Sequence, residues 1–394
     1  MIPRCAFTLV ASLGSLCCLG QAQSLNSIRL NGYVQAAAVS PDARYIAVVT
    51  LNSTQQTDGS WANAESVQVL EPGTGKIVSS RALEHAALVR TGPLDPSSAF
   101  IRYCDEGKYL LAYDGNGEVD IFDSSSFALA SQIDLVRQSG FSPGMHVKVA
   151  CSSASDSVAI SLQGGRTGTG IVRVVEISSG KDIATWNENR PSDEIKALSI
   201  SQDGAKIALL LGNAQWPLRA PVGPNVEVRD TRHLEVLSQF STADAPSGLL
   251  FAGNSAIATV QSSSGGRFSG KRGIVIWDAE TGKEAMRLVD AHADVYGSIA
   301  SSADGRLILG YIPEIHSCAL CNGLEGRVEV KKQQFAVWDA STGKQVFRSE
   351  SFGPVVRPFQ PECVLSAKGN VVMVYWPSTQ TTPRIIPWTP NARN

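Results

Sequence analysis

The sequence lacks the signals of several classes of protein. It has no run of lysine and arginine, and its 34 basic residues nearly balance its 36 acidic residues. A basic patch is the footprint of nucleic-acid binding, so we expect no nucleic-acid partner. Beyond the first 22 residues, no segment is long and apolar enough to cross a bilayer. We therefore expect no transmembrane span.

Sequence motifs of common enzymes are also missing. There is no Gly-x-Ser-x-Gly turn, no His-Glu-x-x-His pair and no obvious pair of carboxylates placed for acid–base catalysis. The five histidines are spread along the chain. We therefore predict no catalytic residue, no metal site and no cofactor, although an active site assembled from distant loops would leave no such motif.

The first residues have the pattern of a secretory signal peptide. Arg4 precedes an apolar run over residues 5–19, and Gly20-Gln21-Ala22 places small residues where signal peptidase reads them. The run is shorter than the roughly 20 residues of a spanning helix, and Leu16 before Cys17 does not fit a lipoprotein signal. We expect cleavage after Ala22 and export to the periplasm or the extracellular space.

A unit of strand, tight turn and strand recurs through the rest of the chain. Turns of the Ser-x-Asp-Gly-Lys type lie at residues 40–44, 104–108, 201–205, 302–306 and 366–370, with weaker versions at 152–157 and 252–255. The second half of each unit is a hairpin, in most units with a glycine that supplies the positive φ of a tight turn. Seven such four-stranded units predict an all-β fold: a seven-bladed β-propeller of antiparallel blades, as a single domain over residues 23–394.

The last unit is one strand short. Residues 363–365, 371–376 and 384–388 supply three strands, and the segment Leu25 to Leu30 has no other place in the repeat. We predict that residues 25–30 complete the last blade and close the ring. This closure would remove an open sheet edge that invites aggregation.

Two dipeptides give the chain a family resemblance. Trp277-Asp278 and Trp338-Asp339 match the dipeptide after which WD repeats are named. On these residues the chain resembles WD-repeat proteins and related bacterial seven-bladed propellers over residues 25–390. Only His292 resembles the turn histidine of the family, which indicates a divergent bacterial member. Some propellers of this kind are lactonases or subunits of quinone-linked dehydrogenases.

The long insertions fall at one end of the repeat units. If the strands of a blade are named a to d from the channel outward, the a–b and c–d turns lie on one side of the ring and are short. The long segments are the b–c insertions 52–66, 164–170, 212–225, 262–273 and 313–332 and the crossings 84–98, 136–146, 187–194 and 351–362. We call their side the loop-rich face and the other the tight-turn face. Neutral drift would not respect a face so consistently, and loop elaboration on one face is typical of a binding surface.

The loop-rich face is rich in the residue types that dominate binding energies. Arginine and tryptophan are enriched among binding hot spots, and arginine can also hold a carboxylate or a sugar acid with two parallel hydrogen bonds. Each arginine alone is an ordinary solvated loop residue, and only their shared location is informative. The residues expected on this face are Trp61, His85, Arg90, Arg166, Trp216, Arg219, Arg267, Arg272, His316 and Arg357.

Five cysteines follow the signal peptide, so at least one is left unpaired within the chain. Cys318 and Cys321, with His316 nearby, could form a local disulfide, hold a metal ion or remain thiols; an oxidising compartment favours the disulfide. Cys104 and Cys151 end innermost strands of neighbouring units, so a bridge between them is a second possibility. We expect Cys363 to be buried.

These observations favour a monomeric, non-catalytic scaffold that binds a protein or an extended ligand on the loop-rich face. The alternative is a propeller enzyme, either a lactonase-like hydrolase or a subunit of a quinone-linked dehydrogenase, with its site over the central channel. An enzyme of that kind should bring ionisable side chains from at least three blades into a deep central pocket.

Overall fold

The fold is described from a computed structural model of the 394-residue chain. It describes residues 26–27, 30, 32–55, 57, 61–72, 74–83, 99–113, 117–135, 146–163, 170–188, 193–213, 224–242, 246–261, 273–288, 299–316, 329–349, 351, 362–375 and 384–387. The signal peptide predicted over residues 1–22 lies outside these ranges. No helix in the described ranges is long and apolar enough to cross a membrane.

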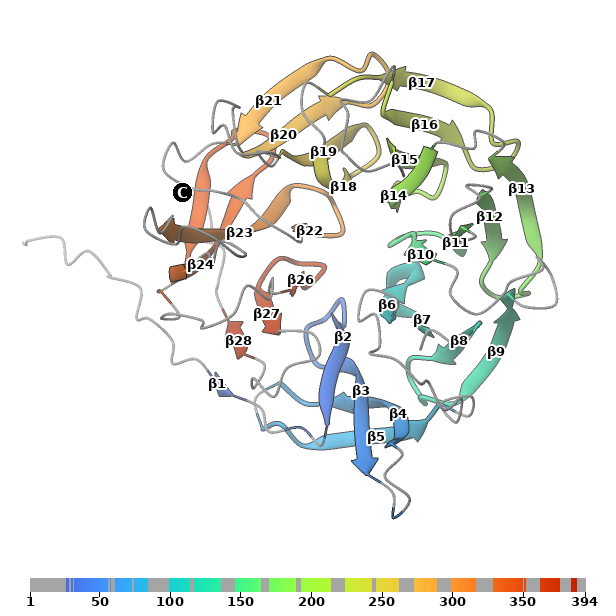
Figure 1. The fold of residues 1–394 in the computed structure, drawn as a ribbon, viewed down its shortest axis with the longest axis vertical. Coiled ribbons are helices and arrows are strands. Elements are labelled where there is room, and N and C mark those ends of the chain that lie inside the picture. Colours follow the sequence, from blue (N-terminus) through green and yellow to red (C-terminus); the bar gives the residue numbers. More distant parts are fainter. Residues whose placement is uncertain are drawn as a thin grey trace, which may run out of the picture.

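The chain is an all-β propeller with six four-stranded antiparallel blades, each built from consecutive strands (Figure 1). The first three blades are β2 (Tyr33–Val39), β3 (Ile46–Gln55), β4 (Trp61–Leu70) and β5 (Ile77–Ala82); β6 (Phe100–Cys104), β7 (Tyr109–Tyr113), β8 (Glu118–Asp123) and β9 (Leu129–Asp134); and β10 (His146–Cys151), β11 (Ser157–Gln163), β12 (Gly170–Glu176) and β13 (Asp182–Glu188). The next three are β14 (Asp193–Ile200), β15 (Lys206–Asn213), β16 (Val226–Asp230) and β17 (Val236–Phe240); β18 (Pro246–Ala252), β19 (Ala256–Gln261), β20 (Gly273–Asp278) and β21 (Glu284–Leu288); and β22 (Ile299–Ser301), β23 (Leu307–His316), β24 (Glu329–Asp339) and β25 (Gln345–Arg348).

The remaining strands lie between the sixth and first blades in the ring (Figure 1). They are β26 (Glu362–Leu365), β27 (Val371–Tyr375) and β28 (Arg384–Pro387). The short β1 (Asn26–Ser27) pairs antiparallel with β28, with Asn26 opposite Ile385. The N-terminal segment therefore pairs with the last strand of the chain, as predicted, and the described pairing covers Asn26 and Ser27.

The middle strands of the blades are buried on both sides because each sheet is packed between two others. Every residue of β7 is buried, as is nearly every residue of β11, whereas the outer strand β9 alternates between more buried and more exposed positions. Hydrophobic clusters accordingly combine residues of neighbouring sheets. Trp277 packs on Phe240 of the preceding blade, with ring centroids 5.3 Å apart, and Trp338 packs with Ile274 in the same way. Both tryptophans thus lie between blades, as predicted.

A disulfide joins Cys104 to Cys151, with Cα atoms 5.7 Å apart. It links the ends of the innermost strands β6 and β10 in neighbouring blades. The bridge that the sequence offered as a second possibility is therefore formed. Cys363 is buried, as expected, at 3% exposure. Cys318 and Cys321 lie outside the described residues, and their disulfide stays a prediction.

Candidate functional site

The structure describes the backbone of two residues predicted for the loop-rich face. Trp61 is paired with Gln55 at the end of the β3–β4 hairpin, and His316 is paired with Glu329 at the end of the β23–β24 hairpin. Both therefore stand at the ends of b–c hairpins, in the first and sixth blades, and their part in a binding face stays a prediction. The others lie outside the described residues: His85, Arg90, Arg166, Trp216, Arg219, Arg267, Arg272 and Arg357.

Two insertions predicted on this face are extended hairpins. β3 and β4 stay paired from Ile46–Leu70 to Gln55–Trp61, and β23 and β24 from Leu307–Asp339 to His316–Glu329. Most of the expected insertion at 52–66, and the two ends of the one at 313–332, therefore belong to paired strands. Both hairpins are longer than the β7–β8 hairpin of the second blade, whose strands have five and six residues. They carry Trp61 and His316 to their outer ends.

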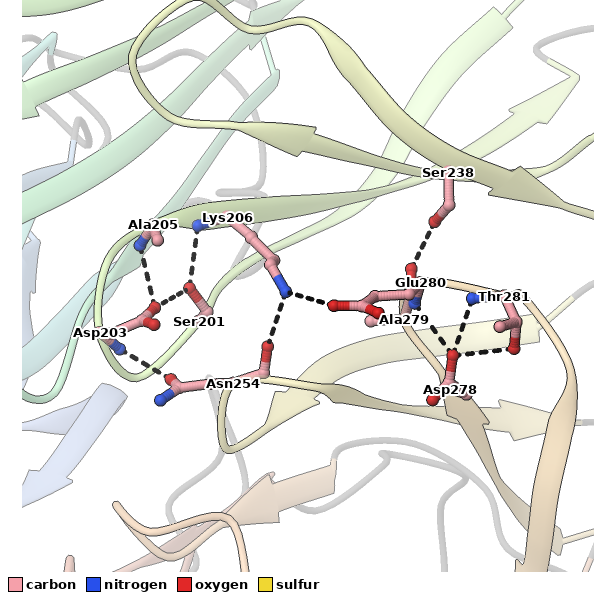
Figure 2. Close-up of polar contacts among 10 residues, drawn as sticks. All are labelled: Ser201, Asp203, Ala205, Lys206, Ser238, Asn254, Asp278, Ala279, Glu280 and Thr281. Carbon is pink, nitrogen blue, oxygen red and sulfur yellow. Dashed lines mark hydrogen bonds and ion pairs between the residues drawn. The ribbon is translucent and has the colours of Figure 1, made fainter.

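The tight-turn face is formed by short turns whose polar groups are used within the protein. In the turn after β20, the Asp278 carboxylate accepts three hydrogen bonds (Figure 2). They come from the Glu280 N–H at 3.1 Å, the Thr281 N–H at 2.7 Å and the Thr281 hydroxyl at 2.8 Å. The N–H and hydroxyl of Thr281 hold the pKa of Asp278 below its usual range. The aspartate of the Trp-Asp dipeptide is thus a turn cap, a role for which aspartate is favoured because it mimics a backbone turn.

Charged side chains of this face also connect neighbouring blades. The Lys206 ammonium lies 3.4 Å from the Asn254 carbonyl and 3.8 Å from the Glu280 carboxylate, both in the next blade (Figure 2). The Asp203 N–H donates to Asn254 Oδ1 at 2.9 Å. Because these groups already have partners across the blade interface, they are poorly placed to bind another molecule.

A central cavity of about 230 Å³ lies where the innermost strands meet. Its wall comes from the ends of β2, β6, β10, β14, β18, β22 and β26 and from the turns that follow several of them. The turns contact one another through the backbone: the Gln202 N–H donates to the Gly253 carbonyl at 3.2 Å, and the Ala303 N–H donates to the Ala367 carbonyl at 3.0 Å. The Ser153 hydroxyl donates to the Ala303 carbonyl at 3.4 Å. Since these two residues belong to the third and sixth blades, this contact crosses the channel.

The cavity has little ionisable chemistry. Among the described residues that line it, Arg102 and Tyr103 are the two with ionisable side chains, apart from the disulfide-bonded Cys151, and both belong to β6. The Tyr103 hydroxyl is buried and has no hydrogen-bond partner within the described part of the chain. Burial, followed by the charge of Asp42, raises the pKa of Tyr103 far above its usual value. The phenol therefore stays protonated at neutral pH and is unsuited to act as a base.

The sequence did not single out Arg102. In Phe-Ile-Arg-Tyr-Cys it has the position of an ordinary polar residue in an alternating strand, and no local signal distinguishes it. Its position becomes distinctive only when seven strands from distant parts of the chain surround it.

No family model matches the chain, and no curated protein matches its sequence. The six four-stranded blades support the resemblance to WD-repeat proteins at the level of the fold alone.

Proposed function

We propose that this propeller is a non-catalytic scaffold that binds a protein or an extended ligand on its loop-rich face. The observation that carries the proposal is the division between the two faces. Turns such as 279–283 are short and internally hydrogen-bonded, whereas residues 214–225, 262–272 and 317–328 separate paired strands on the opposite side. Long connections on a rigid framework are the common location of recognition residues.

The composition of the central cavity supports binding over catalysis. In a propeller enzyme, ionisable side chains from at least three blades should meet in the central cavity. The described lining supplies Arg102 and Tyr103, both from one strand. The hydrolase and dehydrogenase alternatives therefore gain no support from this cavity.

The binding proposal is tested by affinity capture from periplasmic extract with the mature protein, followed by variants. Trp216→Ala with Arg219→Ala should abolish capture of the partner and leave the melting temperature nearly unchanged, because loops contribute little to the packed sheets. Lys283→Ala and Lys344→Ala, in tight turns of the opposite face, are the matched controls and should affect neither property. Capture that survives the loop variants and is lost with the lysine variants would contradict the proposal.

We further propose that β1, β26, β27 and β28 form a seventh blade that closes the ring. In support, β26 contacts both β22 of the sixth blade and β2 of the first, and Leu30 packs in the cluster between these strands and the first blade. Deletion of residues 24–30 from the mature protein should lower the melting temperature and expose an aggregating edge. An unchanged melting temperature would show that the N-terminal segment does not close the ring.

Export belongs to the same proposal. The disulfide between Cys104 and Cys151 fits an oxidising compartment such as the periplasm or the extracellular space. N-terminal sequencing of the purified protein should begin at residue 23 if cleavage follows Ala22.

A further inference from the structure

We propose that the central cavity is a binding site for a small carboxylate, held by Arg102. This site is separate from the loop-rich face and goes beyond the proposed scaffold function. The two proposals can therefore fail independently.

Arg102 carries a charge that the described residues do not neutralise. The Arg102 side chain is exposed, yet it lines a cavity whose described wall contains no aspartate or glutamate. Within the described ranges the guanidinium has no ion-pair partner. The described wall combines apolar residues such as Val39 with neutral polar residues such as Ser153 and Gln202, so it supplies no negative charge. A concave site that carries charge of one sign concentrates ions of the opposite sign.

The inner edges of the blades offer further hydrogen-bond donors. Each innermost strand pairs with one neighbour within its sheet, as β6 does with β7 and β10 does with β11. The other edge of such a strand presents backbone N–H and C=O groups, and here these edges surround the cavity. Some of these N–H groups are already used, as that of Phe251 donates to Ser199 Oγ at 2.8 Å. We assign the remaining ones to the anion as further donors.

The ligand class follows from charge, shape and size. A guanidinium binds a carboxylate through two parallel hydrogen bonds, and one positive charge is neutralised by a monoanion but not by dianionic phosphate. The volume of about 230 Å³ is below the roughly 300 to 1,000 Å³ of ordinary ligand pockets. The cavity therefore suits a short carboxylic acid.

The experiment is a titration of the mature protein with propionate, followed by NMR of its ¹⁵N-labelled arginine side chains. Propionate should bind saturably and shift the Arg102 signal, whereas its neutral isostere propionamide should not bind. Arg102→Gln should weaken propionate binding at least tenfold, and Arg102→Lys should weaken it less because the charge is kept while the paired hydrogen bonds are lost. Lys148→Gln is the matched control: this lysine is on the adjacent innermost strand β10 but is not among the cavity-lining residues.

Three results would overturn the proposal. They are unsaturable propionate binding, equal binding by the Arg102→Gln variant with an unchanged melting temperature, and tighter binding of inorganic phosphate than of propionate. Trp216→Ala with Arg219→Ala should leave propionate binding intact, so failure of the scaffold proposal would be recognised separately.

Discussion

The bond between Cys104 and Cys151 connects two blades at the inner rim of the ring, across a sequence separation of 47 residues. Two backbone hydrogen bonds accompany it, from the Asp105 N–H to the Ser152 carbonyl at 3.1 Å and from the Glu106 N–H to the Ser153 carbonyl at 2.6 Å. We expect reduction of this disulfide to lower the stability of the whole ring measurably, because it releases a large loop in the unfolded chain.

The magnitude follows from loop closure. A cross-link over about 47 residues removes conformational entropy from the unfolded state worth about 4 kcal/mol at 25 °C. At about 2.1 cal/mol/K per residue, a chain of 394 residues unfolds with an entropy of about 0.8 kcal/mol/K. Dividing the first quantity by the second gives a decrease in melting temperature of about 5 °C.

The assay is differential scanning calorimetry with and without a phosphine reductant. The same pair of measurements on the Cys104→Ala, Cys151→Ala double variant is the control, because any remaining shift there comes from other cysteines such as Cys318 and Cys321. The difference between the two shifts isolates the bond between the blades. Mass spectrometry of unreduced peptides checks that the bond is present before the scan.

A difference below about 1 °C in a protein that carries the bond would refute the loop-closure reasoning. It would mean that the unfolded chain is already restricted between these blades, or that the oxidised ring contains compensating strain.

Three further outcomes are expected. In urea unfolding, Gly305→Ala should destabilise the protein by more than Gly180→Ala. Both glycines have φ near +67°, a backbone conformation that costs other residues roughly 1 to 2 kcal/mol. A Cβ at Gly305 would also overlap the backbone of the preceding blade, whereas a Cβ at Gly180 would meet its nearest atom at 3.9 Å. Trp277→Ala and Trp338→Ala should each cost about 3 to 5 kcal/mol in urea unfolding as truncations between blades, and a loss below 1 kcal/mol would contradict their burial. The hydroxyls and backbone N–H groups of Ser125 and Ser126 lower the pKa of Asp123 from 3.8 to about 2. The stabilisation from these hydrogen bonds is therefore complete above about pH 4 and lost as the pH falls toward 2. An NMR titration midpoint near 3.8 would contradict the turn geometry.

The propeller could be predicted because its determinants are local. The serine and aspartate of an a–b turn bond to each other and to the following backbone, as Ser201 does with Asp203 at 2.7 Å and with the Lys206 N–H at 2.9 Å. Trp277 and Asp278 occupy adjacent positions with separate tasks, packing between blades and capping a turn. Since each of these contacts lies within a few residues or recurs in more than one unit, the sequence pattern indicates it.

The ends of the long hairpins could not be predicted for a physical reason. Residues 52–55 and 61–64 are paired through their backbones, yet Ala64 and Thr54 are exposed. A strand that extends into solvent buries no face, so it needs no alternation of polar and apolar residues. Periodicity therefore cannot separate such a hairpin end from a loop.

The charged residues show why residue type alone did not identify the cavity site. By residue type, Lys206 and Asp278 are typical of an exposed charged surface. In the fold, Lys206 is paired with a group in the next blade and Asp278 with groups in its own turn. Arg102 has the appearance of an ordinary strand residue, but the fold places it in a cavity without a described acid. What separates a structural charge from a binding charge is whether the fold supplies its counter-charge. That property depends on seven strands brought together from residues 33 to 365, and so it becomes visible only in the assembled ring.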